Sequence, residues 1–254
     1  MTIAAQGTSH ASAFARDGYV IVEDLFTRAE MEQAKRECQR VLAAKGHASD
    51  GNNADRTKNQ DNGVNVGLAG HSDVIRSLHG DARIVDILAD IIGPNIEFWS
   101  DKAVYKSAVV DYGSPWHQDW PYWRGAHKYS VWMALDDATP ENGCLKLVPG
   151  THASLLTHGW NDAEGIGFWN RMRPEDVDEG KAVVASIRAG SVIVFHDLAL
   201  HSSFPNTSGK DRWCIISTYR DGSADDYEYG FAKANFMARG KWIGKSLGAP
   251  PQEA

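Results

Sequence analysis

An imidazole and a carboxylate stand two residues apart in the stretch Pro115-Trp116-His117-Gln118-Asp119-Trp120. In an extended strand, residues i and i+2 point to the same face, so His117 and Asp119 are expected to aim at one spot. Together they supply two ligands of a 2-His-1-carboxylate triad, which holds Fe(II) and leaves positions open for substrate and oxygen. The third ligand must come from elsewhere in the chain, and His201 is the candidate.

A His-x-Asp pair is a weak signal by itself, because the chain contains ten histidines and 33 acidic residues. The alternative is a histidine that is hydrogen-bonded to a nearby aspartate, without any metal. His196 is a rival third ligand. It lies an odd number of positions before His201 (201 − 196 = 5), so one regular strand cannot direct both side chains at the same ion.

Composition narrows the class of protein. The 254 residues are 43% apolar and 23% charged, as in ordinary globular proteins. A net charge of −7 without a Lys/Arg run argues against a nucleic-acid partner. No apolar run approaches the roughly 20 residues of a membrane span, and the N-terminus does not resemble a signal peptide. We expect a cytoplasmic protein with no membrane partner, whose three cysteines are reduced thiols; the sequence specifies no oligomeric state.

The elements that must position these side chains come in two blocks. Up to Gly93 the sequence predicts mainly helices, among them one that begins at a Thr27–Glu30 capping box and two that begin at Ser72 and Asp81. Short strands broken by Gly, Pro, Asn and Asp follow, with a hairpin turn predicted at Pro140–Gly143. Helices followed by strands indicate an α+β protein that is mainly β.

Two irregular stretches are candidates for loops over the site. The polar stretch from Gly46 to Gly70 is either disordered or a lid, and stretch 155–180 is a second candidate. Aromatic residues near the His-x-Asp pair either fill the core or line a pocket. The candidate substrate contacts in the first stretch and beside the pair are Arg56, Lys58, Asn59, Trp120 and Trp123.

Four motifs in this order resemble the phytanoyl-CoA dioxygenase family of Fe(II)/2-oxoglutarate-dependent oxygenases, and the resemblance covers nearly the whole chain. The motifs are Phe14-x-x-Asp17-Gly18-Tyr19-Val20, Trp116-His117-Gln118-Asp119, Glu141-Asn142-Gly143-Cys144-Leu145-x-x-x-Pro149-Gly150-Thr151-His152, and Ala189-Gly190-Ser191 with Phe195-His196, His201 and Arg212.

The resemblance implies a double-stranded β-helix, the jelly-roll or cupin barrel, with the N-terminal helices packed on one sheet. The chain would be a single domain, 1–254, with a helical part at about 10–93, a barrel core at about 95–220 and a C-terminal tail at about 221–254. One mouth of the barrel would bring His117, Asp119 and His201 together around iron.

The resemblance also implies a site for 2-oxoglutarate. Arg212, 11 residues after His201 (212 − 201), would hold the far carboxylate of the cosubstrate, helped by Ser203. Trp132 and Lys102 would lie beside the cosubstrate. Each has another reading: Arg212 could cap a turn, Ser203 and Trp132 could be ordinary strand and core residues, and Lys102, like Lys106, could be solvated.

The implied activity is hydroxylation of an aliphatic C–H bond of a small molecule, with O2 consumed, succinate and CO2 released, and ascorbate as an optional reductant. Desaturation, epoxidation and ring formation use the same triad. Two other functions fit the residues: a cupin-like metal enzyme that does not use 2-oxoglutarate, and a non-catalytic barrel that serves as a binding module.

Overall fold

Two antiparallel sheets form the core of the protein. The computed structural model describes residues 9–45, 64–107, 113–160, 168, 170–224, 226 and 234–243. The larger sheet, here the major sheet, has seven strands. In spatial order they are β1 (Tyr19–Val22), β9 (Val192–His196), β4 (Lys128–Ala134), β11 (Arg212–Asp221), β3 (Ile96–Lys106) and β12 (Phe236–Arg239), and β2 (Val64–Val66) also pairs with β3.

The smaller sheet, here the minor sheet, contains β10 (His201–Ser203), β5 (Leu145–Leu147) and β8 (Val183–Ala185) in that order. An isolated bridge between His117 and His201 adds the His-x-Asp segment to its edge. The predicted hairpin at Pro140–Gly143 is wrong, because the flanking strands β4 and β5 belong to different sheets. The turn, a 3₁₀ segment that ends at Gly143 with φ +94°, instead carries the chain from one sheet to the other.

The helices precede most of the strands, as predicted, and their first residues are capped as predicted. In α2 (Arg28–Lys45) the Thr27 N–H donates to the Glu30 carboxylate, at 2.7 Å, and the Glu30 N–H donates to the Thr27 hydroxyl, at 3.3 Å. The hydroxyl of Ser72 and the carboxylate of Asp81 accept backbone N–H bonds at the starts of two further helices. These two helices are α4 (Asp73–His79) and α5 (Ala82–Ile92), and α1 (His10–Asp17) precedes β1.

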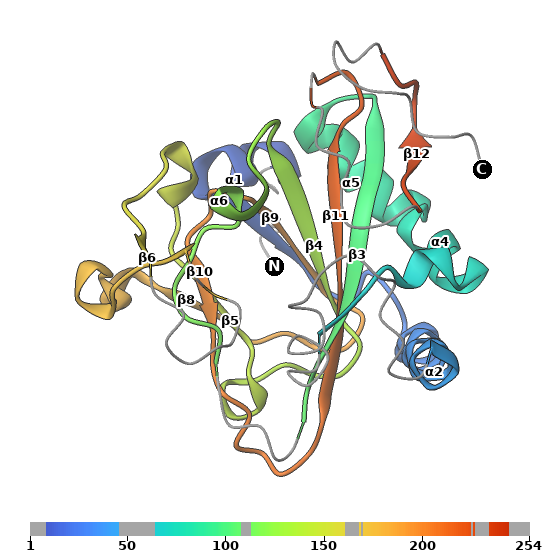
Figure 1. Cartoon of the computed structure of the whole chain (residues 1–254), viewed down its shortest axis with the longest axis horizontal. Helices are drawn as coiled ribbons and strands as arrows, with labels where there is room; N and C mark the ends of the chain where they lie inside the picture. Colours follow the sequence, from blue (N-terminus) through green and yellow to red (C-terminus); the bar gives the residue numbers. More distant parts are fainter. Residues whose placement is uncertain are drawn as a thin grey trace, which may run out of the picture.

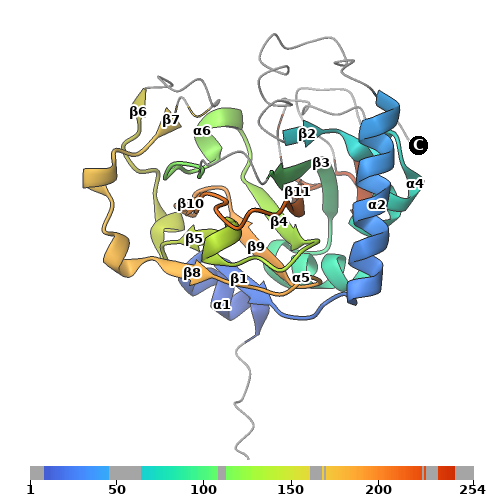
Figure 2. The same ribbon diagram turned by 90° about the horizontal axis from the view of Figure 1, so that it is seen from below.

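Alternation along the strands of the major sheet gives it two apolar faces. Val131 and Met133 of β4 pack with residues of α1, α2, α4 and α5 on the outer face. Trp132 and Ala134 point the other way and pack with Leu145 and other residues of the minor sheet. Figure 1 shows α5 behind β3 and β11, and Figure 2 shows α2 along the outer side of the molecule, away from β5 and β8. The expected α+β layout, with helices packed on one sheet of a β core, is confirmed.

Both stretches expected to be irregular contain short elements where they are described. Residues 64–66 form β2, while Gly46 to 63 lie outside the described residues. In stretch 155–180, β6 (Gly159–Trp160) pairs with β7 (Asn170–Arg171). The sequence did not predict β12, a strand that follows residue 221 in the chain and pairs with β3. Within the described part of the chain, no helix is both long and apolar enough to cross a bilayer.

Candidate active site

His117 and His201 are brought together by backbone pairing between two distant segments. The N–H of each donates to the carbonyl of the other, at 3.0 Å in both directions. Residues in such a pair lie directly opposite one another, so their side chains leave the same face. The two imidazole rings are 4.1 Å apart between centroids. The prediction that a residue 84 positions further along (201 − 117) joins the first histidine is therefore supported by the register of the sheet.

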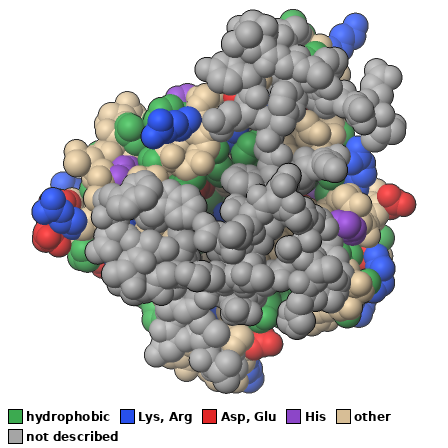
Figure 3. Space-filling model, viewed as in Figure 1, with side chains coloured by type: hydrophobic (Ala, Val, Ile, Leu, Met, Phe, Trp, Pro, Cys, Tyr) green, Lys and Arg blue, Asp and Glu red, His purple; other side chains and the backbone are tan. Residues whose placement is uncertain are grey.

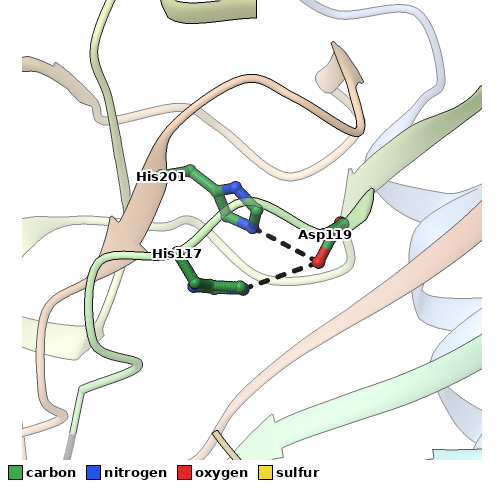
Figure 4. Close-up of side chains that lie close together, drawn as sticks. All are labelled: His117, Asp119 and His201. Atoms are coloured by element: carbon green, nitrogen blue, oxygen red, sulfur yellow. Dashed lines mark ion pairs between the residues drawn. The ribbon is translucent and has the colours of Figure 1, made fainter. Parts of the chain in front are cut away.

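Asp119 reaches the same point by a route that the sequence argument did not foresee. It is not in an extended strand: its φ and ψ are −77° and −31°, and it precedes the short helix α6 (Trp120–Trp123). The carboxylate Oδ1 lies 3.5 Å from His117 Nε2 and 4.0 Å from His201 Nε2. Figure 4 shows the three side chains pointing toward one another. The three side chains converge, but the expectation that His117 and Asp119 share the face of one strand is wrong.

The carboxylate of Asp119 is free because the helix start that follows it needs no cap. An aspartate in this position commonly accepts N–H bonds from the next two or three residues. Here Pro121 has no N–H, the N–H of Tyr122 donates to the Asp119 carbonyl, and the N–H of Trp120 donates to the carbonyl of Asp197. The side chain of Asp119 makes no capping bond and stays available to a ligand.

Backbone carbonyls also fix which nitrogen of each histidine is available. His117 Nδ1 lies 2.8 Å from the Pro115 carbonyl, and His201 Nδ1 lies 2.9 Å from the Ala199 carbonyl. A carbonyl oxygen only accepts, so each Nδ1 carries the proton and each Nε2 presents a lone pair. This arrangement is the usual one around metal-binding histidines.

The donor set fits a divalent iron ion. All three side chains are buried, and their ligand atoms lie within 4.8 Å of one another. Burial lowers the pKa of His201 to about 4, so the imidazole is neutral at pH 7. Burial alone would raise the pKa of Asp119, but His201, His117 and Lys102 together hold it below its usual value. Two neutral imidazoles and one carboxylate on one side of an ion match the facial triad of non-heme Fe(II) oxygenases.

Arg212 is a buried cation without an acidic partner among the described residues. Its side chain donates to the carbonyl of Gly143 at 3.0 Å and of Asn142 at 3.4 Å, and to Cys214 Sγ at 3.1 Å. The guanidinium lies over the ring of Trp132, 5.3 Å from its centroid. A buried charge that has only neutral contacts is costly, so the site favours an anionic ligand. The interpretation of Arg212 as a turn cap is not supported, since it belongs to β11.

Ser203 and Lys106 adjoin Arg212. Lys106 is the partner of Arg212 in the register of β3 and β11, and its ammonium donates to Ser203 Oγ at 2.8 Å. The Ser114 N–H donates to the same hydroxyl oxygen at 2.9 Å. With both lone pairs used, the Ser203 hydroxyl donates its proton to Ser114 Oγ, 2.8 Å away. Lys106, which the sequence left as a solvated lysine, therefore contacts this site.

Lys102, on β3, makes no hydrogen bond or ion pair with the described residues. It lies close enough to Asp119 to lower the pKa of that carboxyl. Trp132 is buried between the sheets and touches the Arg212 guanidinium, so it is both a core residue and part of this region. The assignment of both residues to the cosubstrate stays a prediction.

The predicted substrate contacts have mixed outcomes. Arg56, Lys58 and Asn59 lie outside the described residues. The indole N–H of Trp120 donates to the Gly125 carbonyl at 3.2 Å, and that of Trp123 donates to the Asp197 carboxylate at 3.1 Å. Neither polar atom is therefore available to a substrate.

Two further aromatic residues border the triad: Tyr122, which the sequence places beside the His-x-Asp pair, and Phe168, which the sequence did not single out. The ring centroid of Phe168 lies 4.7 Å from that of His117, and the ring centroid of Tyr122 lies 6.2 Å from the same imidazole.

In the face drawn in Figure 3, the described Lys and Arg side chains are scattered and form no continuous patch.

Gln118 secures the segment between the ligands. It is fully buried, donates to the carbonyls of Leu198 and Ser154, and accepts the N–H of Leu156. His158 accepts the Gln118 N–H at 3.2 Å and thus has a structural role here. These bonds join positions far apart in the sequence, so no local sequence pattern predicted them.

His196, the rival third ligand, lies in a different group. His127, His196 and Asp197 also come within 4.8 Å of one another. The Asp197 carboxylate is 2.9 Å from His127 Nδ1 and 3.1 Å from His196 Nδ1. His127 Nδ1 is hydrogen-bonded to the Asp197 carboxylate and His196 Nδ1 accepts the Leu198 N–H at 3.1 Å, so these atoms are engaged within the protein and do not face a shared ion.

Comparisons with known proteins agree with this geometry. The model of the family described as phytanoyl-CoA dioxygenase matches residues 14–214. A probable alpha-ketoglutarate-dependent hypophosphite dioxygenase of Stutzerimonas stutzeri is 28% identical over 224 residues, which cover 82% of this chain and 76% of that protein. L-proline trans-4-hydroxylase of Streptomyces griseoviridis is 28% identical over 183 residues, covering 58% of this chain and 68% of the hydroxylase.

Solved structures share the fold. The apo form of the non-heme monooxygenase ThoJ superimposes with a TM-score of 0.72 at 24% identity, covering 94% of this chain and 86% of that one. Apo EctD from S. alaskensis gives a TM-score of 0.70 at 20% identity, with 100% of this chain and 88% of that one covered. The predicted jelly-roll core is confirmed. The chain belongs to the phytanoyl-CoA dioxygenase family and is an iron- and 2-oxoglutarate-dependent dioxygenase.

Proposed function

We propose that this enzyme hydroxylates an aliphatic C–H bond of a small molecule and releases succinate and CO2, with His117, Asp119 and His201 as the iron ligands. The observation that carries the proposal is the uncommitted state of these three groups. Both Nε2 atoms and the carboxylate are buried and converge on one point, and the carboxylate lies 3.5 Å or more from both Nε2 atoms.

Arg212 supports the use of a dicarboxylate. Because its guanidinium has no acidic partner among the described residues, the far carboxylate of 2-oxoglutarate would satisfy its charge through two parallel hydrogen bonds. Ser203 would add a third bond when its proton turns from Ser114 Oγ to the same carboxylate. Lys102, beside Asp119, would place a second cation near the metal end of the cosubstrate.

The protein contributes position and exclusion of water to the reaction. Bound Fe(II) and 2-oxoglutarate supply the oxidising power: O2 and the keto acid yield succinate, CO2 and one oxygen atom, which enters the C–H bond to give the alcohol. His117, Asp119 and His201 would hold the iron from one side and leave the opposite side for cosubstrate and O2, with His201 neutral and the pKa of Asp119 below its usual value. The rings of Phe168 and Tyr122 cover His117 and limit access of water to it.

A small polar or charged substrate would resemble the compounds for which three relatives are named. Those at 28–29% identity are named for hypophosphite, L-proline and ectoine. The presence of Asp119 favours hydroxylation over halogenation, because the carboxylate occupies the coordination position that a halide would need.

Succinate release screened over a metabolite library, with Fe(II), ascorbate and 2-oxoglutarate present, tests the proposal. The expected result is succinate formation that a subset of small polar molecules stimulates, with a product 16 mass units heavier than the substrate. Arg212→Met should lower succinate formation at the same 2-oxoglutarate concentration, because binding of the far carboxylate is weakened. Full turnover without 2-oxoglutarate would instead indicate a cupin-like enzyme, and absence of Fe(II) binding would indicate a binding module.

A further inference from the structure

A single residue, Asp197, holds the segment that carries the metal-binding carboxylate. It lies directly after β9 and is fully buried. Its backbone carbonyl accepts the N–H groups of Asp119, at 2.8 Å, and Trp120, at 3.0 Å. Its carboxylate accepts three more bonds, from Trp123 Nε1 at 3.1 Å, His127 Nδ1 at 2.9 Å and the Lys128 N–H at 2.9 Å.

All five of these donors belong to residues 119–128, the segment that follows the His-x-Asp pair. The Asp197 N–H returns a bond to the Lys128 carbonyl at 3.1 Å, and its Oδ1 also lies 3.1 Å from His196 Nδ1. The carbonyl takes the place that the Asp119 side chain would otherwise occupy at the start of α6. The carboxylate fixes the far end of the same segment.

We infer that Asp197 is a positioning residue for the metal site, which keeps the Asp119 carboxylate turned away from α6 and aimed at the ion. The inference rests on the proposed iron site. It assigns to Asp197 no contact with metal, cosubstrate or substrate. Its role is to set the backbone of Asp119 through the 119–128 segment, so its loss should weaken metal binding before it affects any chemical step.

Asp101 provides a matched control on the opposite side of the major sheet. It is also buried, and its carboxylate also accepts three bonds: from Leu68 N at 2.8 Å, Ala69 N at 2.9 Å and His79 Nε2 at 2.8 Å. Its backbone carbonyl likewise accepts an N–H, from Gly67 at 3.0 Å. Asp101→Asn therefore imposes the same chemical change on a comparable network that does not hold a metal ligand.

The experiment is anaerobic titration of the metal-stripped full chain with Co(II), read by its visible absorption, alongside thermal unfolding of the metal-free protein. We expect Asp197→Asn to weaken the Kd for Co(II) roughly 10- to 100-fold, the range typical of residues that orient metal ligands, and to alter the absorption band. Asp101→Asn should lower the Tm comparably and leave the Kd within about twofold of wild type. An unchanged Kd in Asp197→Asn, or equal weakening in both variants, would overturn the inference.

Milder variants cover the case in which Asp197→Asn does not fold. His127→Gln and Trp123→Phe each remove one donor to the Asp197 carboxylate, and the His127 side chain is 47% exposed. Combined, they should weaken Co(II) binding several-fold, and an unchanged Kd would contradict the inference. If Asp119→Ala bound Co(II) as tightly as the wild-type protein does, the proposed iron site would be overturned, and this inference with it.

Discussion

Two buried groups of histidine and aspartate occupy opposite faces of the major sheet, and they differ in what their polar atoms are free to do. On the outer face, His79 Nε2 lies 2.8 Å from Asp101 Oδ2, and His79 Nδ1 lies 2.8 Å from Ser217 Oγ. The hydrogen-bonded series of an aspartate, a histidine and a serine is the one found in a serine-hydrolase triad. All three side chains are fully or almost fully buried, and both imidazole nitrogens are occupied.

The inner group is arranged so that one atom of each residue stays uncommitted. His117 and His201 each use Nδ1 for a backbone carbonyl, and the Asp119 carboxylate makes no capping bond. The residue types are nearly the same in the two groups. What separates a structural network from a metal site is whether the remaining donors and acceptors are satisfied by the protein or left facing one another.

Removing a metal ligand should have the largest effect and should separate the two groups completely. Asp119→Ala is expected to weaken Co(II) or Fe(II) binding by more than about 100-fold, beyond the range of residues that only orient ligands, and to abolish turnover. His79→Gln, in the outer group, should leave metal affinity unchanged. Equilibrium titration of metal-stripped protein measures both, and retained turnover in Asp119→Ala would count against the triad.

The two buried arginines extend the comparison to cations. Arg212 has only neutral partners among the described residues, whereas Arg220 forms ion pairs with Glu97 and Asp226, at 2.9 and 2.8 Å. Arg212→Met should raise the KM for 2-oxoglutarate about 100-fold, since removing one member of a buried charge pair costs about 2–5 kcal/mol. Succinate assays at varied 2-oxoglutarate give this value.

The control is Arg220→Met, which should lower the free energy of unfolding and leave the KM for 2-oxoglutarate near wild type. The groups that lose an ion-pair partner there are the protein's own carboxylates, Glu97 and Asp226, and Asp226 keeps its pair with Lys128. If Arg212→Met lost only stability, Arg212 would be a structural residue like Arg220.

We expect the outer group of His79, Asp101 and Ser217 to contribute more to the free energy of unfolding than to turnover. Asp101→Asn removes a charged acceptor from three donors, and hydrogen bonds to charged groups contribute roughly 1.5–3 kcal/mol each. Because the amide retains one acceptor, we expect a loss of about 2 kcal/mol in the free energy of unfolding. Denaturant titration measures it, and a loss of turnover larger than the loss of folded protein would contradict a purely structural role.

The sequence predicted which residues meet at the site better than it predicted the backbone geometry that brings them together. His-x-Asp spacing made His117, Asp119 and His201 candidates for a triad, and the family resemblance was needed to single out Arg212. The mechanism expected for Asp119, a shared strand face, was wrong. Pro121 and the carbonyl of Asp197 determine its direction, and the bond to Asp197 joins residues 78 positions apart (197 − 119).

The same limit explains the other misses. Pro140–Gly143 has the composition of a hairpin turn, but whether its flanking strands pair is decided by β9 and β10, more than 40 residues away. Lys106 looked solvated because its contact, Ser203, lies on another sheet. Caps and apolar stripes, whose partners are three or four residues away, were predicted correctly, as at Thr27 and Glu30.

Lys106 gives the smallest expected effect and tests whether the cation site has a second member. Burial, with repulsion from Arg212, lowers the pKa of Lys106 to about 7. The ammonium is therefore mostly charged at pH 6 and mostly neutral at pH 8, while the carboxylates of 2-oxoglutarate stay ionised, so affinity should fall as pH rises. Because Lys106 is partly exposed, we expect a decline on the order of fivefold, or about 1 kcal/mol. The ratio of Kd values between wild type and Lys106→Met, measured anaerobically at each pH, cancels other titrating groups; a ratio that stays constant from pH 6 to 8 would exclude Lys106 from the carboxylate site.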